Sequence, residues 1–429
     1  MTGPPLVSDF RYLRRFLAGQ AASFLGDGVI GVALAFAVLD AGGSAADVGL
    51  VIAARSVAMV GFLLFGGVVA DRVSRRTILV GCDVARLAAQ AAMAAMVIGG
   101  VTAIWPLAVL NVLHGTASGL FAPAAVGIVP SIAPAGRLQQ ANAMRGMAYS
   151  LGNIAGPALA GVLVAAFGPG QAIGAASAAY LVSAVLLARL PATAPGPSDG
   201  RSVLGDLREG WKGFRARRWV WATVVFSSLG NLLLAAFLVL GPVIAERSLG
   251  GPPAWAAVMT ALGAGAFVGG LAALRIRPGR PLRVAVPLAA LSALPALALA
   301  ADRPVTVVAA VTFTAGMGLT IFNALWETSL QTHIPHSQLS RVSSWDDFGS
   351  FICQPLGQAL VGPLAAGIGI TSTLWLAGGL QIFITALLLC VPAIRTMPAA
   401  RADTREPSAN PAQTPTRGTA AAPRQDRPG

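Results

Sequence analysis

The chain has 429 residues, of which 55% are hydrophobic and only 11% are charged. A soluble protein carries about 25% charged residues, so this composition excludes an ordinary soluble domain and indicates a membrane protein. The net charge of +13 would suggest a nucleic-acid partner only if it gathered on one soluble face.

Apolar stretches long enough to cross a bilayer, for which about 20 residues are needed, recur along the whole chain. We therefore expect an all-α membrane protein with twelve transmembrane helices in two pseudo-symmetric bundles of six. The stretches lie at residues 16–39, 47–69, 78–99, 104–125, 142–166, 170–190, 219–243, 255–274, 284–301, 305–326, 348–368 and 371–393.

The basic residues follow the loops in an alternating pattern. They precede the first stretch and follow the second, fourth, sixth, eighth, tenth and twelfth. The intervening loops contain only Arg247 and Arg303, each beside an acid. Since short basic loops stay on the cytoplasmic side, both termini are expected in the cytoplasm. The charge therefore encodes membrane topology, and the expected partner is the lipid bilayer, not nucleic acid.

Two ionisable residues lie inside the first two stretches, and such groups are costly at membrane depth and are candidates for function. Asp27 and Arg55 reach similar depths along antiparallel helices that rise about 1.5 Å per residue, so they can form a pair. Asp27 either exchanges a proton during a conformational cycle or forms a permanent structural pair with Arg55. Because a neighbouring arginine stabilises an ionised carboxylate, the sequence favours the structural role.

Between the second and third stretches, residues 66–76 read Gly-Gly-Val-Val-Ala-Asp-Arg-Val-Ser-Arg-Arg. This spacing resembles the loop between helices 2 and 3 of the major facilitator superfamily of transporters, although Ser74 stands where family members usually carry glycine. The resemblance implies a gating loop in the N-terminal half. Its expected members are Gly67, Asp71, Arg72, Arg75, Arg76, Asp83 and Arg86.

The fourth stretch contains two polar residues, Asn111 and His114. They are candidates for contact with a substrate, because polar side chains in a transmembrane helix face the protein interior or a water-filled path. The alternative, which we favour, is that they form hydrogen bonds to neighbouring helices.

The fifth stretch is rich in small residues. Gly152, Gly156 and Ala160 are four apart and share one helix face, which permits close helix packing. Pro157 removes a backbone donor and can bend the helix. Together with Gly161, this run resembles the motif in the fifth helix of drug/proton antiporters of the superfamily, with Ala160 in place of the usual glycine. The resemblance implies export, whereas the alternative is generic packing of small residues.

The chain also repeats itself. Residues 130–162 and 331–363 align without a gap, which pairs Gly156 with Gly357 and Gly161 with Gly362. A parallel six-helix repeat is typical of the two halves of this superfamily. We expect bundles at residues 1–190 and 219–395, a cytoplasmic linker with an amphipathic helix at 191–218, and a disordered cytoplasmic tail at 396–429.

Opposite charges occupy equivalent positions in this repeat, because Arg145 aligns with Asp346. Glu327 and Asp347 lie nearby. This arrangement predicts salt bridges between the halves that close the cytoplasmic side in one state. The alternative is that they are solvated charges at helix ends.

Further patterns, including the segment from Ser23 to Asp27 and the segment from Pro355 to Gly357, resemble the branch that contains macrolide-efflux and enterobactin-exporter proteins. The resemblance implies a monomeric exporter of a bacterial cell membrane that moves a small, partly apolar molecule by proton antiport and alternating access. The alternatives are an importer or facilitator of the same fold, or a membrane receptor that transports nothing. No nucleophile–base pair, metal-ligand spacing or ATP-binding loop is recognisable, so neither an enzyme nor a cofactor is expected.

Overall fold

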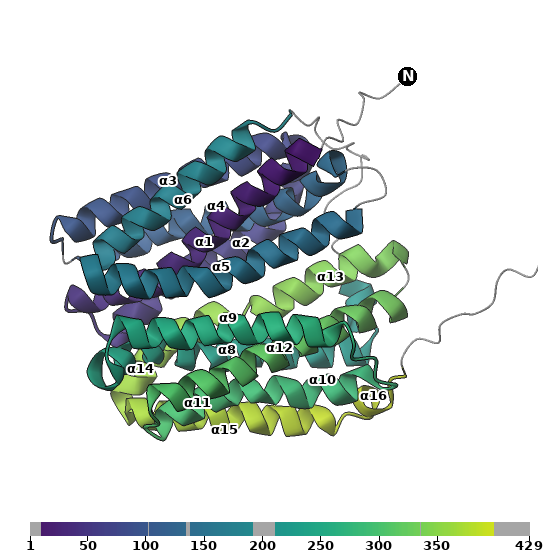
Figure 1. Ribbon diagram of the computed structural model, residues 1–429. Coiled ribbons are helices and arrows are strands. Elements are labelled where there is room, and N and C mark those ends of the chain that lie inside the picture. Colours follow the sequence, from purple (N-terminus) through teal and green to yellow (C-terminus); the bar gives the residue numbers. More distant parts are fainter. Residues whose placement is uncertain (1–9, 102, 134–137, 192–210, 335, 399–429) are drawn as a thin grey trace, which may run out of the picture.

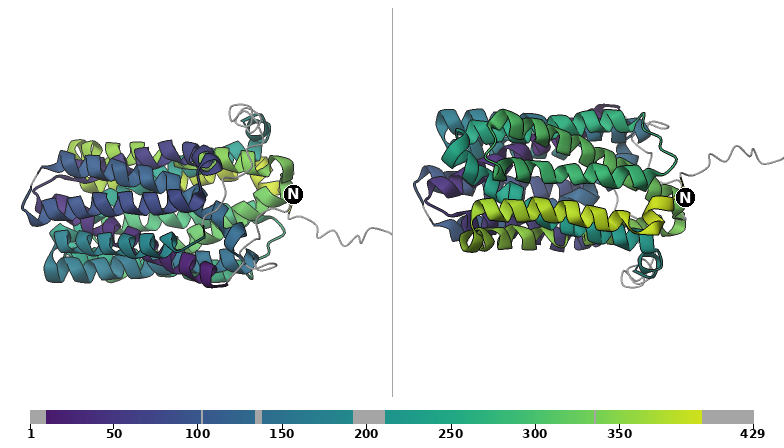
Figure 2. Two further views of the ribbon diagram at one scale, coloured as in Figure 1. Left: turned by 90° about the horizontal axis from the view of Figure 1, so that it is seen from above. Right: turned by 90° about the horizontal axis from the view of Figure 1, so that it is seen from below.

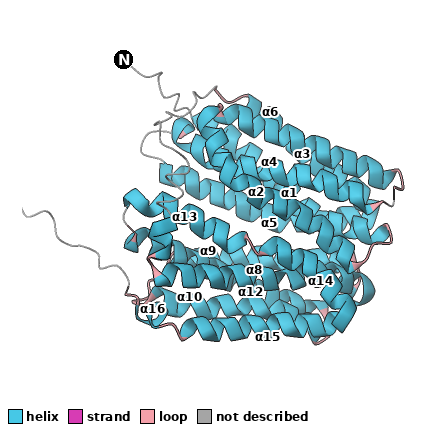
Figure 3. Cartoon of the chain, turned by 180° about the vertical axis from the view of Figure 1, so that it is seen from behind, coloured by secondary structure: helices cyan, strands magenta, loops and turns pink. Residues whose placement is uncertain are grey.

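The computed structural model describes residues 10–101, 103–133, 138–191, 211–334 and 336–398, and this part of the chain contains helices and no strand (Figure 3). The N-terminal helices are α1 (Phe10–Asp40), α2 (Ala45–Arg72), α3 (Arg75–Ile98), α4 (Ile104–Ile132), α5 (Leu138–Phe167) and α6 (Pro169–Ala188). The C-terminal helices are α8 (Arg218–Ile244), α9 (Pro252–Ala273), α10 (Pro281–Ala289), α11 (Leu294–Ala300), α12 (Val305–His333), α13 (His336–Phe351), α14 (Gln354–Ile368), α15 (Ile370–Leu389) and α16 (Pro392–Thr396).

Twelve spans within the described residues are long and apolar enough to cross a membrane, so the predicted all-α membrane fold is confirmed. Several helices extend beyond the predicted stretches; α1 begins at Phe10 and α4 continues to Ile132. Hydropathy marks only the apolar part of a helix, while backbone hydrogen bonding continues until a cap or a proline ends it. The predicted amphipathic helix lies mostly outside the described residues, although its end at 211–215 is helical and buries Phe214.

Two spans are interrupted, which hydropathy alone did not predict. The ninth span changes from α10 to α11 through a 3-10 turn at Ala290–Ala293, and the eleventh breaks between α13 and α14. Pro295 and Pro355 stand at the starts of α11 and α14. Proline has no N–H to donate, and its ring clashes with the carbonyl four residues earlier, so each break falls just before a proline.

Helices α1–α6 pack mainly against one another, as do α8–α15, and the two groups lie one above the other in Figure 1. Figure 2 shows the N-terminal group from above and the C-terminal group from below. Helices α1 and α16 have their outer ends at the same end of the bundle (Figure 1), which we call the termini end. The opposite end, where α2 begins and α5 and α14 end, is the far end.

The two groups of helices join closely at the far end, through α5 with α9 and α2 with α14. One buried apolar core contains residues of both groups, among them Val164 of α5 and Trp255 of α9. A second core, which includes Phe16 and Phe121, contains only N-terminal residues and lies toward the termini end. Apolar packing therefore holds the two groups together at the far end.

Candidate functional site

The first polar cluster centres on Asp27 of α1. Its Oδ1 lies 2.6 Å from Arg55 Nη2 of α2, so the structure contains the contact that similar depth along two antiparallel helices had suggested. The same oxygen accepts a hydrogen bond from Tyr180 Oη of α6 at 3.2 Å. The side chains of Asp27 and Arg55 are 27% and 25% exposed, whereas Tyr180 is fully buried. The pair therefore faces accessible space while buried groups anchor it from behind.

His114 of α4 is the third partner of Asp27. Its Nε2 lies 3.3 Å from Asp27 Oδ1, and its Nδ1 lies 2.9 Å from Gln90 Nε2. An amide nitrogen can only donate, so with the Gln90 amide in this orientation Nδ1 accepts and the ring proton lies on Nε2, directed at the carboxylate. Asn111, by contrast, donates to the carbonyl of Val51 at 2.7 Å and joins α4 to α2. The structure thus brings His114 to Asp27 and places Asn111 in helix packing.

A second, more deeply buried layer lies beside this cluster. Asp83 of α3 accepts a hydrogen bond from Ser183 Oγ at 2.6 Å and another from Ser23 Oγ at 3.2 Å. Its Oδ1 lies 3.4 Å from Arg86 Nη1. The Arg86 guanidinium lies 4.3 Å from the ring centroid of Phe121 and 5.7 Å from that of Tyr180. Asp83 and Arg86 therefore form an internal pair that adjoins the Asp27 cluster through Tyr180.

The loop between α2 and α3 is described only in part. The backbone of Gly67, Asp71 and Arg72 belongs to α2, but the surroundings of Gly67 and the side chains of Asp71 and Arg72 are outside what the structure describes. Arg75 donates to the carbonyl of Gly127 in α4 at 2.6 Å, and Arg76 donates to that of Ala188 at the end of α6. Both arginines thus join the loop to carbonyls of the N-terminal group, and the gating role of the loop stays a prediction.

The small residues of α5 contact two different helices, α1 and α9. A Cβ at Gly156 would lie 2.6 Å from Gly28 Cα, and one at Gly152 would lie 2.5 Å from Phe24 Cβ, so both glycines admit α1. Gly161 instead faces Ala256 of α9 in the other group. Gly156 and Pro157 both pack beside Gly28, where α5 crosses α1. The motif therefore combines packing within one half with contact between the halves.

The equivalent residues of the C-terminal group repeat this division. Gly357 abuts the backbone of Leu232 in α8, while Gly362 abuts Ala46 of α2 across the boundary between the groups. In each half, the first glycine of the aligned pair therefore contacts a helix of its own half, and the second contacts a helix of the other half. This correspondence supports the internal repeat inferred from the aligned sequences.

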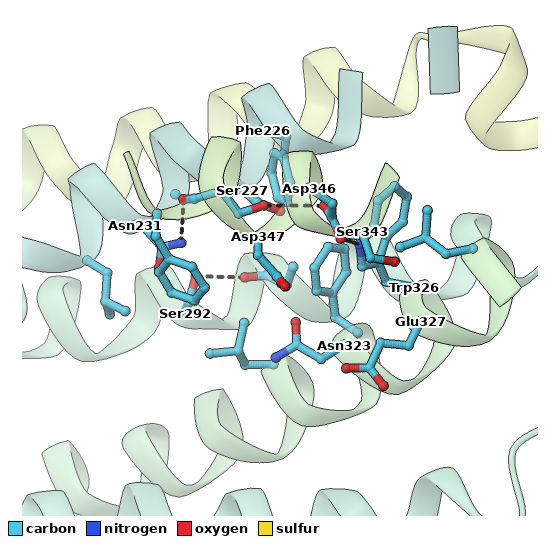
Figure 4. Close-up of a pocket in the computed structure, with 18 of the residues that line it drawn as sticks. Phe226, Ser227, Asn231, Ser292, Asn323, Trp326, Glu327, Ser343, Asp346 and Asp347 are labelled. Atoms are coloured by element: carbon cyan, nitrogen blue, oxygen red, sulfur yellow. Dashed lines mark hydrogen bonds between the residues drawn. The ribbon is translucent and has the colours of Figure 1, made fainter. Parts of the chain in front are cut away.

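A pocket of about 450 Å³ lies within the C-terminal group and is lined mainly by residues of α8, α12 and α13 (Figure 4). Its lining includes three acids, Glu327, Asp346 and Asp347. Asp346 is buried and accepts hydrogen bonds from Trp326 Nε1 at 2.9 Å and Ser350 Oγ at 3.5 Å. Glu327 and Asp347 are exposed to the pocket. Asn231 of α8 also lines the pocket and donates a hydrogen bond to the carbonyl of Ser350 in α13 at 2.9 Å.

The family follows from comparison with known proteins. A model of the Major Facilitator Superfamily matches residues 16–358. The chain belongs to this superfamily. With its twelve spans and its bacterial relatives, it is a multi-pass transporter of a bacterial cytoplasmic membrane.

Two relatives match the transporter over most of its length. It is 26% identical over 390 residues to the enterobactin exporter EntS of Escherichia coli O1:K1 / APEC, which covers 89% of this chain and 90% of the relative. It is 27% identical over 393 residues to the multidrug efflux pump Tap of Mycolicibacterium fortuitum, which covers 86% of this chain and 91% of the pump. Both matches agree with the branch that the sequence patterns resemble.

Solved structures show the same fold. The nucleoside transporter NupG superposes with a TM-score of 0.71 at 14% identity, covering 88% of this chain and 98% of the other. A bacterial homolog to the human lysosomal transporter Spinster, in an inward-facing and unoccupied conformation, superposes with a TM-score of 0.69 at 15% identity, covering 90% and 97%. At these identities the likeness establishes the fold alone.

The salt bridge expected between Arg145 and Asp346 is absent from the described residues of this conformation. Arg145 Nε instead donates to Gln20 Oε1 at 3.1 Å within the N-terminal half, while Asp346 lines the pocket. Because the halves are joined at the far end, charges on either side of the termini end do not meet. A salt bridge between Arg145 and Asp346 in another state of the transporter stays a prediction.

Several residues of the site were not predicted to belong to it, namely Ser23, Gln90, Phe121, Tyr180 and Ser183. Tyr180 had a usable signal, since it is one of only three tyrosines and stands in an alanine-rich apolar stretch. The serines had none, because small hydroxyl side chains are common in transmembrane helices, where they pack and bond locally.

Proposed function

We propose that this transporter exports a small, partly apolar molecule from the bacterial cytoplasm by alternating access, driven by proton antiport. The observation that carries the proposal is the Asp27 cluster, in which a carboxylate and its arginine partner face accessible space. Arg55, His114 and Tyr180 stabilise the ionised carboxylate in this state, so the proposal requires Asp27 to take up its proton in a state of the cycle in which the contact with Arg55 opens.

The direction of transport rests on the relatives and on the topology. The two relatives described above match over most of the chain and are named as an exporter and as an efflux pump. Basic loops favour the cytoplasm, which would place the termini end inside. The structure, joined at the far end, would then be an inward-facing state ready to take cargo from the cytoplasm. An importer or facilitator of the same fold is the alternative, and it predicts accumulation inside the cell.

Drug-susceptibility profiling in a pump-deficient host tests the proposal. We expect expression of the transporter to raise the inhibitory concentration of at least one small, partly apolar compound by about fourfold or more. A protonophore should abolish this protection and the corresponding uptake into inverted membrane vesicles. Uptake that persists without a proton gradient would exclude antiport, and accumulation of the compound in intact cells would reverse the direction.

The loop between α2 and α3 gives a second expectation, which rests on its sequence. Asp71→Asn removes the only acid among its arginines, so we expect vesicle uptake to fall at least tenfold while membrane insertion is unchanged. Asp302→Asn, in an exposed turn at the far end, is the matched control and should transport normally. Full uptake by Asp71→Asn at equal expression would remove the gating role.

A further inference from the structure

Charge is distributed unequally between the two halves. In the N-terminal half the membrane-embedded carboxylates have arginine partners, Asp27 with Arg55 and Asp83 with Arg86. In the C-terminal half, none of the described residues that line the pocket is Lys, Arg or His, although three of them are acids. Charges inside a membrane protein need a partner or water. A pocket with uncompensated carboxylates is therefore suited to a positively charged ligand.

The acids also stand in different surroundings. Asp346 is fixed by hydrogen bonds from Trp326 and Ser350. No hydrogen bond or ion pair to another described residue holds the carboxylates of Glu327 and Asp347. Figure 4 shows Asp347 on α13 and Glu327 on α12, so the two free carboxylates reach the pocket from different helices. A ligand that neutralises one or both would also relieve the repulsion between these like charges.

A second, independent observation comes from α15. Gln381 is 4% exposed and lines the pocket, and its Oε1 is buried with no hydrogen-bond partner among the described residues. Within 4 Å of a Cβ built at Gly230 lie only atoms of Gln381, the nearest being this oxygen at 3.4 Å, so the amide has space to turn toward the pocket. A buried acceptor without a partner is costly. A ligand carrying an N–H donor would satisfy it.

Aromatic side chains also line the pocket. Phe226 and Phe322 pack edge to face with ring centroids 6.1 Å apart, and Trp326 lies beside them in the lining. Aromatic faces attract organic cations and bury apolar surface at the same time. The pocket thus combines negative charge, a buried amide acceptor and aromatic side chains.

We propose that this pocket is the cargo site and that the cargo is an organic cation with an apolar body and N–H donors. The assignment rests on the proposed transport function and names its substrate class. Asp347 and Glu327 supply the opposite charge, Gln381 accepts a hydrogen bond from the cargo, and Phe226, Phe322 and Trp326 contact its apolar body.

Equilibrium binding of ethidium, a flat aromatic cation with N–H donors, to the purified full-length transporter in lipid nanodiscs tests this assignment. We expect Asp347→Asn to raise the dissociation constant at least tenfold, Asp347→Glu to stay close to wild type, and Asp302→Asn to have no effect. Glu327→Gln provides a second removal of charge, should Asp347→Asn fail to assemble. Neutral phenanthridine should compete at least tenfold more weakly than ethidium.

Gln381→Leu separates the hydrogen bond from the charge. It should weaken ethidium binding severalfold and leave binding of tetraphenylphosphonium, a cation without N–H donors, unchanged. Equal binding of ethidium by wild type and both acid variants, or equal competition by phenanthridine, would overturn the assignment. The binding assay needs no proton gradient, so it tests the site separately from export. If the protein binds ethidium in an Asp347-dependent way but exports nothing, the site is supported and only the proposed export is refuted. Uphill export of a neutral compound without ethidium binding would refute only the site.

Discussion

Replacement of Asp27 by asparagine is expected to abolish uphill export while cargo still binds. The variant keeps a side chain of the same shape that can still accept the hydrogen bond from Tyr180, but it can no longer take up and release a proton. Breaking a fully buried ion pair typically costs about 3–5 kcal/mol. Since Asp27 and Arg55 are each about a quarter exposed, water can solvate the remaining arginine, and the cost falls below that range. We therefore expect Asp27→Asn to assemble and its vesicle uptake to fall at least 100-fold.

The double variant Asp27→Asn with Arg55→Gln distinguishes proton exchange from a structural pair. It removes both charges, so a purely structural pair would be replaced without an unpaired ion, and transport would recover. We expect the double variant instead to bind cargo with near-normal affinity and to equilibrate it without concentrating it. The measurements are cargo binding in nanodiscs and uptake into proteoliposomes with and without a pH gradient. Recovery of gradient-driven uptake in the double variant would exclude Asp27 as the proton carrier.

Gly161→Leu should drive the two halves apart at the far end. A side chain at Gly161 meets Ala256 of α9, and overpacking of this kind costs about 1–3 kcal/mol. Each 1.4 kcal/mol changes an equilibrium constant about tenfold, so the population of the far-end-closed state should fall roughly 5- to 150-fold. Vesicle uptake should fall at least tenfold because the cycle needs that state. Gly146→Leu is a matched control on the same helix, since nothing lies within 4 Å of a Cβ built there.

Spin labels at Asp40 and Arg247, which are exposed in opposite halves at the far end, can measure this shift. In a background without native cysteines, Gly161→Leu should lengthen the dominant distance between the labels, and Gly146→Leu should leave it unchanged. Gly362→Leu, against Ala46 of α2, should act like Gly161→Leu. An unchanged distance in both Gly161→Leu and Gly362→Leu would show that these glycines do not control closure.

The class of protein, the number of spans and the internal repeat could all be predicted from the amino-acid sequence. These properties are local in the chain, because a bilayer requires an unbroken apolar stretch whatever its neighbours are. The sequence also suggested the pair of Asp27 and Arg55, since depth along two consecutive antiparallel helices follows from counting residues. The breaks at Pro295 and Pro355 escaped prediction because hydropathy does not register a missing backbone donor.

Which side chains meet across helices that are distant in sequence became known from the folded structure. The rotation of a helix about its axis and the choice of its neighbours depend on packing over the whole bundle, so Tyr180 and His114 could not be assigned to Asp27 from the sequence. The same reason separates Gly156 from Gly161, which one motif had joined but which face α1 and α9. It also places Asp346 and Asp347 with Glu327 around a pocket of one half, where matching positions in the repeat had suggested a bridge to Arg145.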